Sequence, residues 1–132
     1  MKYFTIAELC RSNTADRLGI NNKCNQEHVA NLTALVDNVL DPLREAYGKP
    51  ITVNSGYRCP TLNKAVKGAA SSQHMTGQAA DIDTGDRQQN KLLFEYIRKN
   101  LPFDQLIDES NFAWVHVSFR ADGNNRNQVL KL

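Results

Sequence analysis

The chain has 132 residues, of which 41% are hydrophobic and 23% are charged. This composition is typical of one globular domain and excludes a low-complexity or fibrous chain. The formal net charge of +2 does not indicate nucleic-acid binding, because the basic residues are spread along the chain instead of forming a run.

The N-terminal segment carries charges throughout and contains no long apolar run. We therefore expect neither a signal peptide nor a membrane span, and we expect synthesis in the cytoplasm. A substrate outside the cytoplasm would then be reached only after release by another agent. Residues 5–11 (TIAELCR) predict a short helix that begins at Thr5, with Glu8 three residues later as in a capping box.

Three cysteines, Cys10, Cys24 and Cys59, leave at least one thiol without a partner in the chain. Their spacing matches no zinc-finger pattern. The simpler expectation is that all three are reduced, and a single disulfide bridge is the alternative.

Residues 26–48 (QEHVANLTALVDNVLDPLREAYG) predict the longest helix, with Asn25 as its cap and Gly48 at its end. Pro42 is expected to kink this helix or to begin a new helical turn. His28 is expected to be an ordinary surface or boundary residue. The apolar side chains recur at helical spacing and predict a buried face: Val29, Leu32, Leu35, Val36, Val39, Leu40 and Leu43.

The remainder of the chain predicts strands with a helix between them, which indicates an α+β domain. Leu92, Leu93, Tyr96 and Ile97 are expected to face the core from that helix. No apolar stripe is left over, so a monomer is expected. In chain order the elements are a strand at about 51–54, a short helix after Pro60, a strand at 78–84, a helix at 87–101, and strands at 103–109 and 113–119 that form a hairpin.

A candidate metal site begins in residues 71–81 (SSQHMTGQAAD), where His74 and Asp81 lie seven residues apart around small residues. His116 lies 35 residues after Asp81, in the second strand of the hairpin. Two histidines and a carboxylate suit a catalytic zinc, which needs three protein ligands and an open fourth position. Asp83 shares a strand face with Asp81 and is a candidate for orienting a ligand. The alternative is that the histidines are only packed in the core.

The predicted hairpin supplies a candidate general base, Glu109. With a loop at 110–113, Glu109 lies opposite Trp114 and Ile107 lies opposite His116. Glu109 and His116 then project to the same side of the sheet, where a carboxylate can take the proton of an attacking water. A charged strand end is the alternative. Asp104 and Asp108 are expected on the other face.

Arg58 is the candidate for binding substrate or stabilising an oxyanion, because it ends a turn (SGYR, 55–58) that follows a strand. A surface salt bridge is the alternative for this arginine. Trp114 is a candidate for the wall of a substrate pocket, with core packing as the commoner use of a lone tryptophan in a strand.

Four segments together resemble one known family: SGYRCPTLNKAV, SSQHMTGQAADID, FDQLIDE and WVHVSF. They are similar to the zinc D-Ala-D-Ala carboxypeptidase family of peptidoglycan peptidases, which includes phage endolysins that cut L-alanyl-D-glutamate bonds. The likeness runs from about residue 50 to 119 and is greatest to short members, often encoded by phages or prophages. The signature residues come in one order before W-V-H: Ser72, His74, Gly77, Ala79 and Asp81.

The resemblance implies one zinc ion per chain, held by His74, Asp81 and His116. It also implies that Arg58 steadies the carbonyl oxygen and that Ser72 contacts substrate. The implied fold is a small α+β domain with a central antiparallel sheet, shared with the hedgehog signalling domain. The whole chain, 1–132, would form one zinc peptidase-like domain, with N-terminal helices at about 5–47 and a metal-site core at about 50–120. The implied activity is hydrolysis of the peptidoglycan stem peptide at the cell wall.

One position departs from the family pattern. Many members carry an acidic residue three positions before the last histidine, where this chain has Ala113. Either Glu109 acts as the base across the hairpin, or the chain binds zinc without efficient cleavage. The second case would make it a non-catalytic wall-binding or phage structural module.

Overall fold

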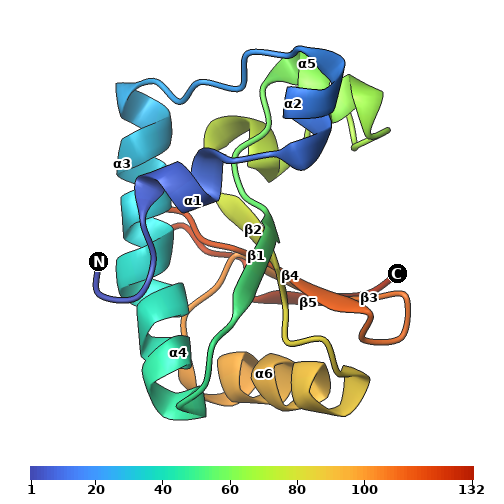
Figure 1. The fold of residues 1–132 in the computed structure, drawn as a ribbon. Helices are drawn as coiled ribbons and strands as arrows, with labels where there is room; N and C mark the ends of the chain where they lie inside the picture. Colours follow the sequence, from blue (N-terminus) through green and yellow to red (C-terminus); the bar gives the residue numbers. More distant parts are fainter.

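The computed structural model describes all of residues 1–132 and contains helices and a single five-stranded sheet (Figure 1). The helices are α1 (Ile6–Cys10), α2 (Asn13–Leu18), α3 (Gln26–Leu35), α4 (Asp41–Tyr47), α5 (Pro60–Ala65) and α6 (Arg87–Asn100), with a π-helical turn η1 (Val36–Leu40) and a 3-10 turn η2 (Gln73–Thr76). The strands are β1 (Thr52–Ser55), β2 (Ala79–Asp83), β3 (Gln105–Glu109), β4 (Trp114–Ser118) and β5 (Gln128–Lys131).

The sheet has the order β1-β2-β4-β3-β5, and every pairing is antiparallel except that of β5 with β3. This arrangement confirms the α+β fold class with a central, mainly antiparallel sheet. The hairpin between β3 and β4 has the predicted register, with Glu109 opposite Trp114 and Ile107 opposite His116. The helix α2 and the strand β5 were not predicted, because both are short and largely exposed.

The long predicted helix is divided by a π-helical turn just before its proline. Pro42 lies in the first turn of α4, so the prediction of a new helical turn is confirmed. Proline has no N–H to donate and its ring crowds the carbonyl four residues earlier. The backbone widens there by one residue, so that the Asp41 N–H donates to the carbonyl of Val36. Asn25 caps the start of α3, and Gly48 ends α4 in the left-handed conformation with φ 77°.

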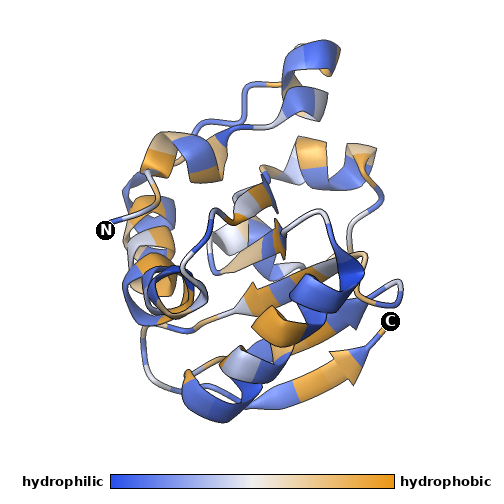
Figure 2. Ribbon diagram, turned by 60° about the horizontal axis from the view of Figure 1, so that its bottom comes forward, coloured by the Kyte–Doolittle hydropathy of each residue, from blue (hydrophilic) through white to orange (hydrophobic).

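The core lies between the α3–α4 column, α6 and the sheet (Figure 1). Figure 2 shows polar and apolar residues alternating along the helices, as expected where each helix buries one face. From α6 the buried apolar residues are Leu93, Phe94 and Ile97. The predictions for Leu92 and Tyr96 were wrong: their exposed fractions are 56% and 37%. They lie on the flank of the buried stripe, beside α4.

Cys10 and Cys24 form a disulfide bridge, and Cys59 is free. The expectation that all cysteines are reduced was therefore wrong, and the alternative of one bridge holds. The end of α1 and the segment before α3 lie side by side at this point. Asn22 reinforces the contact, because its Nδ2 donates to the carbonyls of Cys10 and Tyr57, both at 2.9 Å. None of the helices combines the length and the apolar character that crossing a bilayer requires.

Candidate metal centre

His74 is fixed by contacts with Ser72 and with Gly56, the residue that follows β1. It lies in η2, where its N–H donates to Ser72 Oγ at 3.2 Å, and only 1% of the residue is exposed. Its ring Nδ1 lies 2.7 Å from the Gly56 carbonyl oxygen. Since a carbonyl only accepts, Nδ1 carries the proton and the neutral ring turns the lone pair of Nε2 the other way.

Asp81 and His116 meet His74 because β2 and β4 are neighbours in the sheet. Asp81 lies directly opposite His116 in the β2–β4 register. Asp81 Oδ1 is 3.0 Å from His116 Nδ1 and 3.3 Å from His74 Nε2. One ligand atom from each of these three residues lies within 4.8 Å of the other two. The structure thus brings together three side chains that are up to 42 residues apart in sequence.

The protonation of this cluster suits a cation. Burial lowers the pKa of His74, because an imidazolium is poorly stabilised away from water, and Asp81 opposes this shift only in part. Burial alone would raise the pKa of Asp81, but its contacts with the rings of His74 and His116 hold that pKa well below its ordinary value. The neutral His74 ring therefore directs a lone pair at an ionised carboxylate. Two acceptors in this arrangement fit a metal ion between them, and two nitrogens with one carboxylate oxygen fit zinc.

Glu109 and Arg58 line the same cavity of about 570 Å³ as the three cluster residues. Burial, and next the charge of Asp81, raise the pKa of Glu109 above its ordinary value. Burial lowers the pKa of Arg58, while the charges of Asp81 and Glu109 oppose that shift. The Arg58 Nε is buried without a hydrogen-bond partner, and none of the ion pairs includes this residue. The alternative of a surface salt bridge does not describe Arg58.

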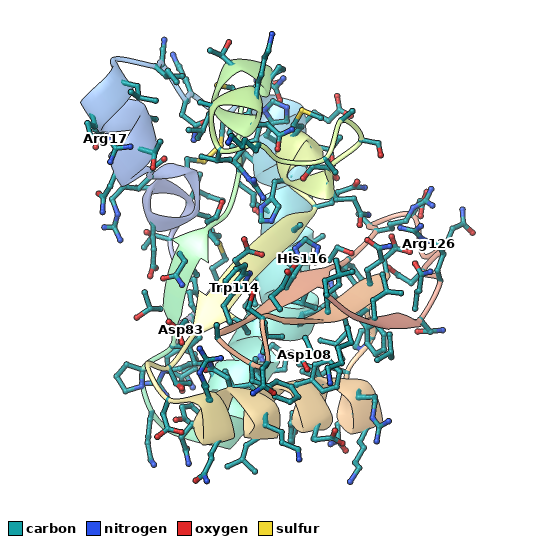
Figure 3. The ribbon with its side chains drawn as sticks, turned by 90° about the vertical axis from the view of Figure 1, so that its right-hand side faces the viewer. Arg17, Asp83, Asp108, Trp114, His116 and Arg126 are labelled. Atoms are coloured by element: carbon teal, nitrogen blue, oxygen red, sulfur yellow. A yellow bond between two sulfur atoms is a disulfide. The ribbon has the colours of Figure 1, made fainter.

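Ser72 and Trp114 also line this cavity, whereas Asp83 does not. The carboxylate Oδ1 of Asp83 accepts from Asn90 Nδ2 at 2.8 Å and from the Gly85 N–H at 2.9 Å, so it organises the turn before α6. Figure 3 shows Asp83 nearer α6 and away from His116. Asp83 therefore does not reach the His74–Asp81–His116 cluster, because β2 continues beyond Asp81 toward α6.

Two partners of the site were missed by sequence reasoning. The Gly56 carbonyl that orients His74 is a backbone group and leaves no signature in side-chain type. Asp104 was expected on the far face of the sheet, and this was wrong. Its carboxylate accepts from Gln73 Nε2 at 2.8 Å and from Arg126, both of which line the cavity. Asp104 precedes β3, so the alternation of strand faces does not yet apply to it.

Two comparisons with known proteins agree with this geometry. A family model described as peptidase M15 matches residues 2–118. A zinc D-Ala-D-Ala carboxypeptidase of Streptomyces albus G is 51% identical over 49 residues. That match covers 36% of this chain and 19% of the length of the relative. The family match includes the N-terminal helices as well as the metal-site core.

Proposed function

Because this chain belongs to the peptidase M15 family, we propose that it is a zinc metallopeptidase that hydrolyses a peptide bond in the stem peptide of peptidoglycan. The observation that carries the proposal is the cluster of His74, Asp81 and His116 in a cavity shared with Glu109 and Arg58. The similar Streptomyces protein is named for both zinc and a D-alanyl peptide, which supports the metal and the class of substrate. The proposed place of action is the cell wall.

Zinc is the cofactor that this donor set fits, with one ion per chain. His74 would hold it through Nε2, together with the Asp81 carboxylate and the His116 ring. When bound, zinc polarises the scissile carbonyl and lowers the pKa of the attacking water. The hydrogen bond from His74 Nδ1 to the Gly56 carbonyl keeps Nε2 free and directed at that position.

Glu109 has the proposed role of general base. It lies on the same side of the sheet as His116, one diagonal step away, because Ile107 is the direct partner of that histidine. From there the carboxylate takes a proton from the attacking water and returns it to the leaving amine nitrogen. Glu109 would then supply the carboxylate that many family members carry at the position of Ala113, three residues before the last histidine.

Arg58 is proposed to stabilise the oxyanion that forms when water attacks the peptide carbonyl. Its backbone N–H donates to the carbonyl of His74 at 3.0 Å, which anchors the Arg58 main chain beside the cluster, and its side chain lines the cavity. The partly buried guanidinium, whose Nε has no hydrogen-bond partner, is available to the negative charge that develops in the transition state. Ser72 and Trp114 are proposed substrate contacts in the cavity wall.

A non-catalytic module that binds zinc and cell wall is the second candidate, and Ala113 is the observation that favours it. Both candidates are tested by incubating the purified protein, with zinc and after chelation, with defined peptidoglycan fragments. Mass spectrometry of the products then identifies the bond. Loss of one D-alanine indicates a carboxypeptidase, and a cut after L-alanine or within a cross-link indicates an endopeptidase of endolysin type. No cleavage by a protein that holds one zinc would reject the peptidase and support the binding module.

A further inference from the structure

The C-terminal segment forms one wall of the cavity that holds the metal cluster. The strand β5 pairs in parallel with β3, which places Gln128 opposite Gln105. Arg126, just before β5, lines the cavity together with Leu130 and Leu132. Figure 3 shows Arg126 and His116 on the same side of the sheet, with Asp108 on the other side, toward α6.

Arg126 is held in one orientation by a buried carboxylate. Asp104 is fully buried, and it accepts from the Arg126 backbone N–H at 2.8 Å, from Nε at 3.0 Å and from Nη2 at 2.7 Å. Asp104 Oδ2 also accepts from Nε2 of Gln73 at 2.8 Å. Gln73 directly precedes His74 in the chain. A two-pronged contact of this kind fixes the plane of a guanidinium.

One nitrogen of this guanidinium remains available. Arg126 Nη1 donates to no protein atom, and the side chain is 51% exposed at the cavity wall. The Arg126–Asp104 pair is neutral as a whole, but its carboxylate is buried, whereas its guanidinium is half exposed and belongs to the lining of the cavity. A donor that is already immobile loses little further entropy when a ligand binds.

We propose that Arg126 binds a carboxylate of the substrate peptide, held in place by Asp104 as a positioning residue. The inference rests on the proposed function, because it adds a substrate contact to that site. A peptidoglycan stem peptide carries one carboxylate at its chain terminus and another on its glutamate residue, and both are suitable ligands. Both would form the same charge-assisted hydrogen bond with the free edge of the guanidinium.

The test compares synthetic stem peptides in which one carboxylate at a time is replaced by a carboxamide. For the carboxylate that Arg126 binds, the amide raises KM of the wild-type enzyme about tenfold, as loss of one charge-assisted bond predicts, with kcat nearly unchanged. Arg126→Gln raises KM for the acid peptide by a similar factor and leaves KM for the amide unchanged. The peptide that shows this pattern identifies the terminal or the glutamate carboxylate.

Two further variants make the result specific. Arg120→Gln is the matched control, because Arg120 lies earlier in the same loop, pairs with Asp122 and does not line the cavity. It is expected to discriminate acid from amide as the wild type does. The double variant Asp104→Asn/Arg126→Gln removes both charges, so no buried carboxylate is left unpaired if the single variant fails to fold.

The inference is overturned if the Arg126 variants still distinguish acid from amide, or if they lose kcat equally on both peptides, as a purely structural role predicts. It is also overturned if the wild type is indifferent to both amide substitutions. These results would leave the proposed function intact. Failure of the zinc-loaded wild type to cleave any of the peptides would instead overturn the peptidase assignment, and this inference with it.

Discussion

Among single residues, Gly56 is important for the metal centre because it has no side chain. A Cβ atom on Gly56 would lie 2.1 Å from the carbonyl oxygen of Leu9, in the backbone at the end of α1. This close approach sets the position of the Gly56 carbonyl, which accepts the hydrogen bond from His74 Nδ1. The glycine therefore links the packing of α1 to the orientation of a proposed zinc ligand.

Gly56→Ala is expected to destabilise the fold by about 1–3 kcal/mol, because backbone must move to admit the methyl group. It is also expected to weaken zinc binding about 10- to 100-fold, because His74 loses its orienting partner. Denaturant unfolding and a zinc competition titration measure the two effects. Gly85→Ala is the control, since a Cβ at Gly85 meets no atom within 4 Å and only its positive φ of 86° opposes the change. Wild-type zinc affinity in Gly56→Ala would contradict this role for the carbonyl.

Glu109→Gln is expected to lower the rate of peptide hydrolysis about 10²- to 10⁴-fold, because the amide cannot accept the proton of the attacking water. Zinc content is expected to stay at one ion per chain, since Glu109 is not a proposed ligand. Single-turnover rates and metal analysis of the same sample check both statements. Glu27→Gln, on the exposed start of α3, is the control. Unchanged hydrolysis in Glu109→Gln would mean that another group is the base.

At the level of helices and strands, the sequence predicted those elements whose local residue pattern is compatible with only one structure. The register of the hairpin followed from its loop length, and the start of α4 followed from the missing N–H of Pro42. The strand β5 has no buried residue and alternates weakly, so its pairing with β3 depends on the rest of the sheet. The bridge between Cys10 and Cys24 likewise depends on how α1 folds back on α3.

Removing the disulfide by Cys10→Ser/Cys24→Ser is expected to cost about 3 kcal/mol, because the bridge closes a short loop, with a sequence separation of 14, in the unfolded chain. Equilibrium unfolding of the oxidised protein and the double variant measures this difference. Cys59→Ser is the control, because Cys59 is free and a serine can also accept from the Leu62 N–H that Cys59 caps. A stability change below 1 kcal/mol in the double variant would contradict the prediction.

The contact between Asp104 and Arg126 joins the start of β3 to the segment before β5 and predicts a dependence of stability on pH. Hydrogen bonds from Arg126 lower the pKa of Asp104 from 3.8 to about 2, against the effect of burial. The ionised carboxylate therefore stabilises the folded chain by about 2 kcal/mol above pH 4, and this contribution is lost as the pH falls from about 4 to 2.

Asp104→Asn removes that contribution, so its free energy of unfolding should fall less than that of the wild type between pH 4 and pH 2. Urea unfolding at a series of pH values measures the two slopes. Asp16→Asn, at an exposed carboxylate on α2, is expected to follow the wild type. Equal slopes for Asp104→Asn and wild type would show that the carboxylate has the same pKa folded and unfolded.

In the whole molecule, the order of the strands in the sheet determines which residues meet at the candidate metal centre. The strands β2 and β4 are adjacent although a helix and β3 separate them in the chain, and this adjacency sets Asp81 opposite His116. The sequence predicted these members because histidines are few and their spacing matches a specific signature. It did not predict the wall formed by Arg126, Leu130 and Leu132, since that wall exists only once β5 has joined β3.

We propose that the His74–Asp81–His116 cluster holds one zinc ion that is required for peptidoglycan hydrolysis. The most direct measurement is a titration of metal-free protein with zinc in which bound zinc and hydrolysis of a defined stem peptide are followed together. Both are expected to rise in proportion and to reach their plateau at one zinc per chain, and Asp81→Asn is expected to shift both to higher zinc concentration. Hydrolysis by the metal-free protein, or a full zinc site without hydrolysis, would contradict this proposal.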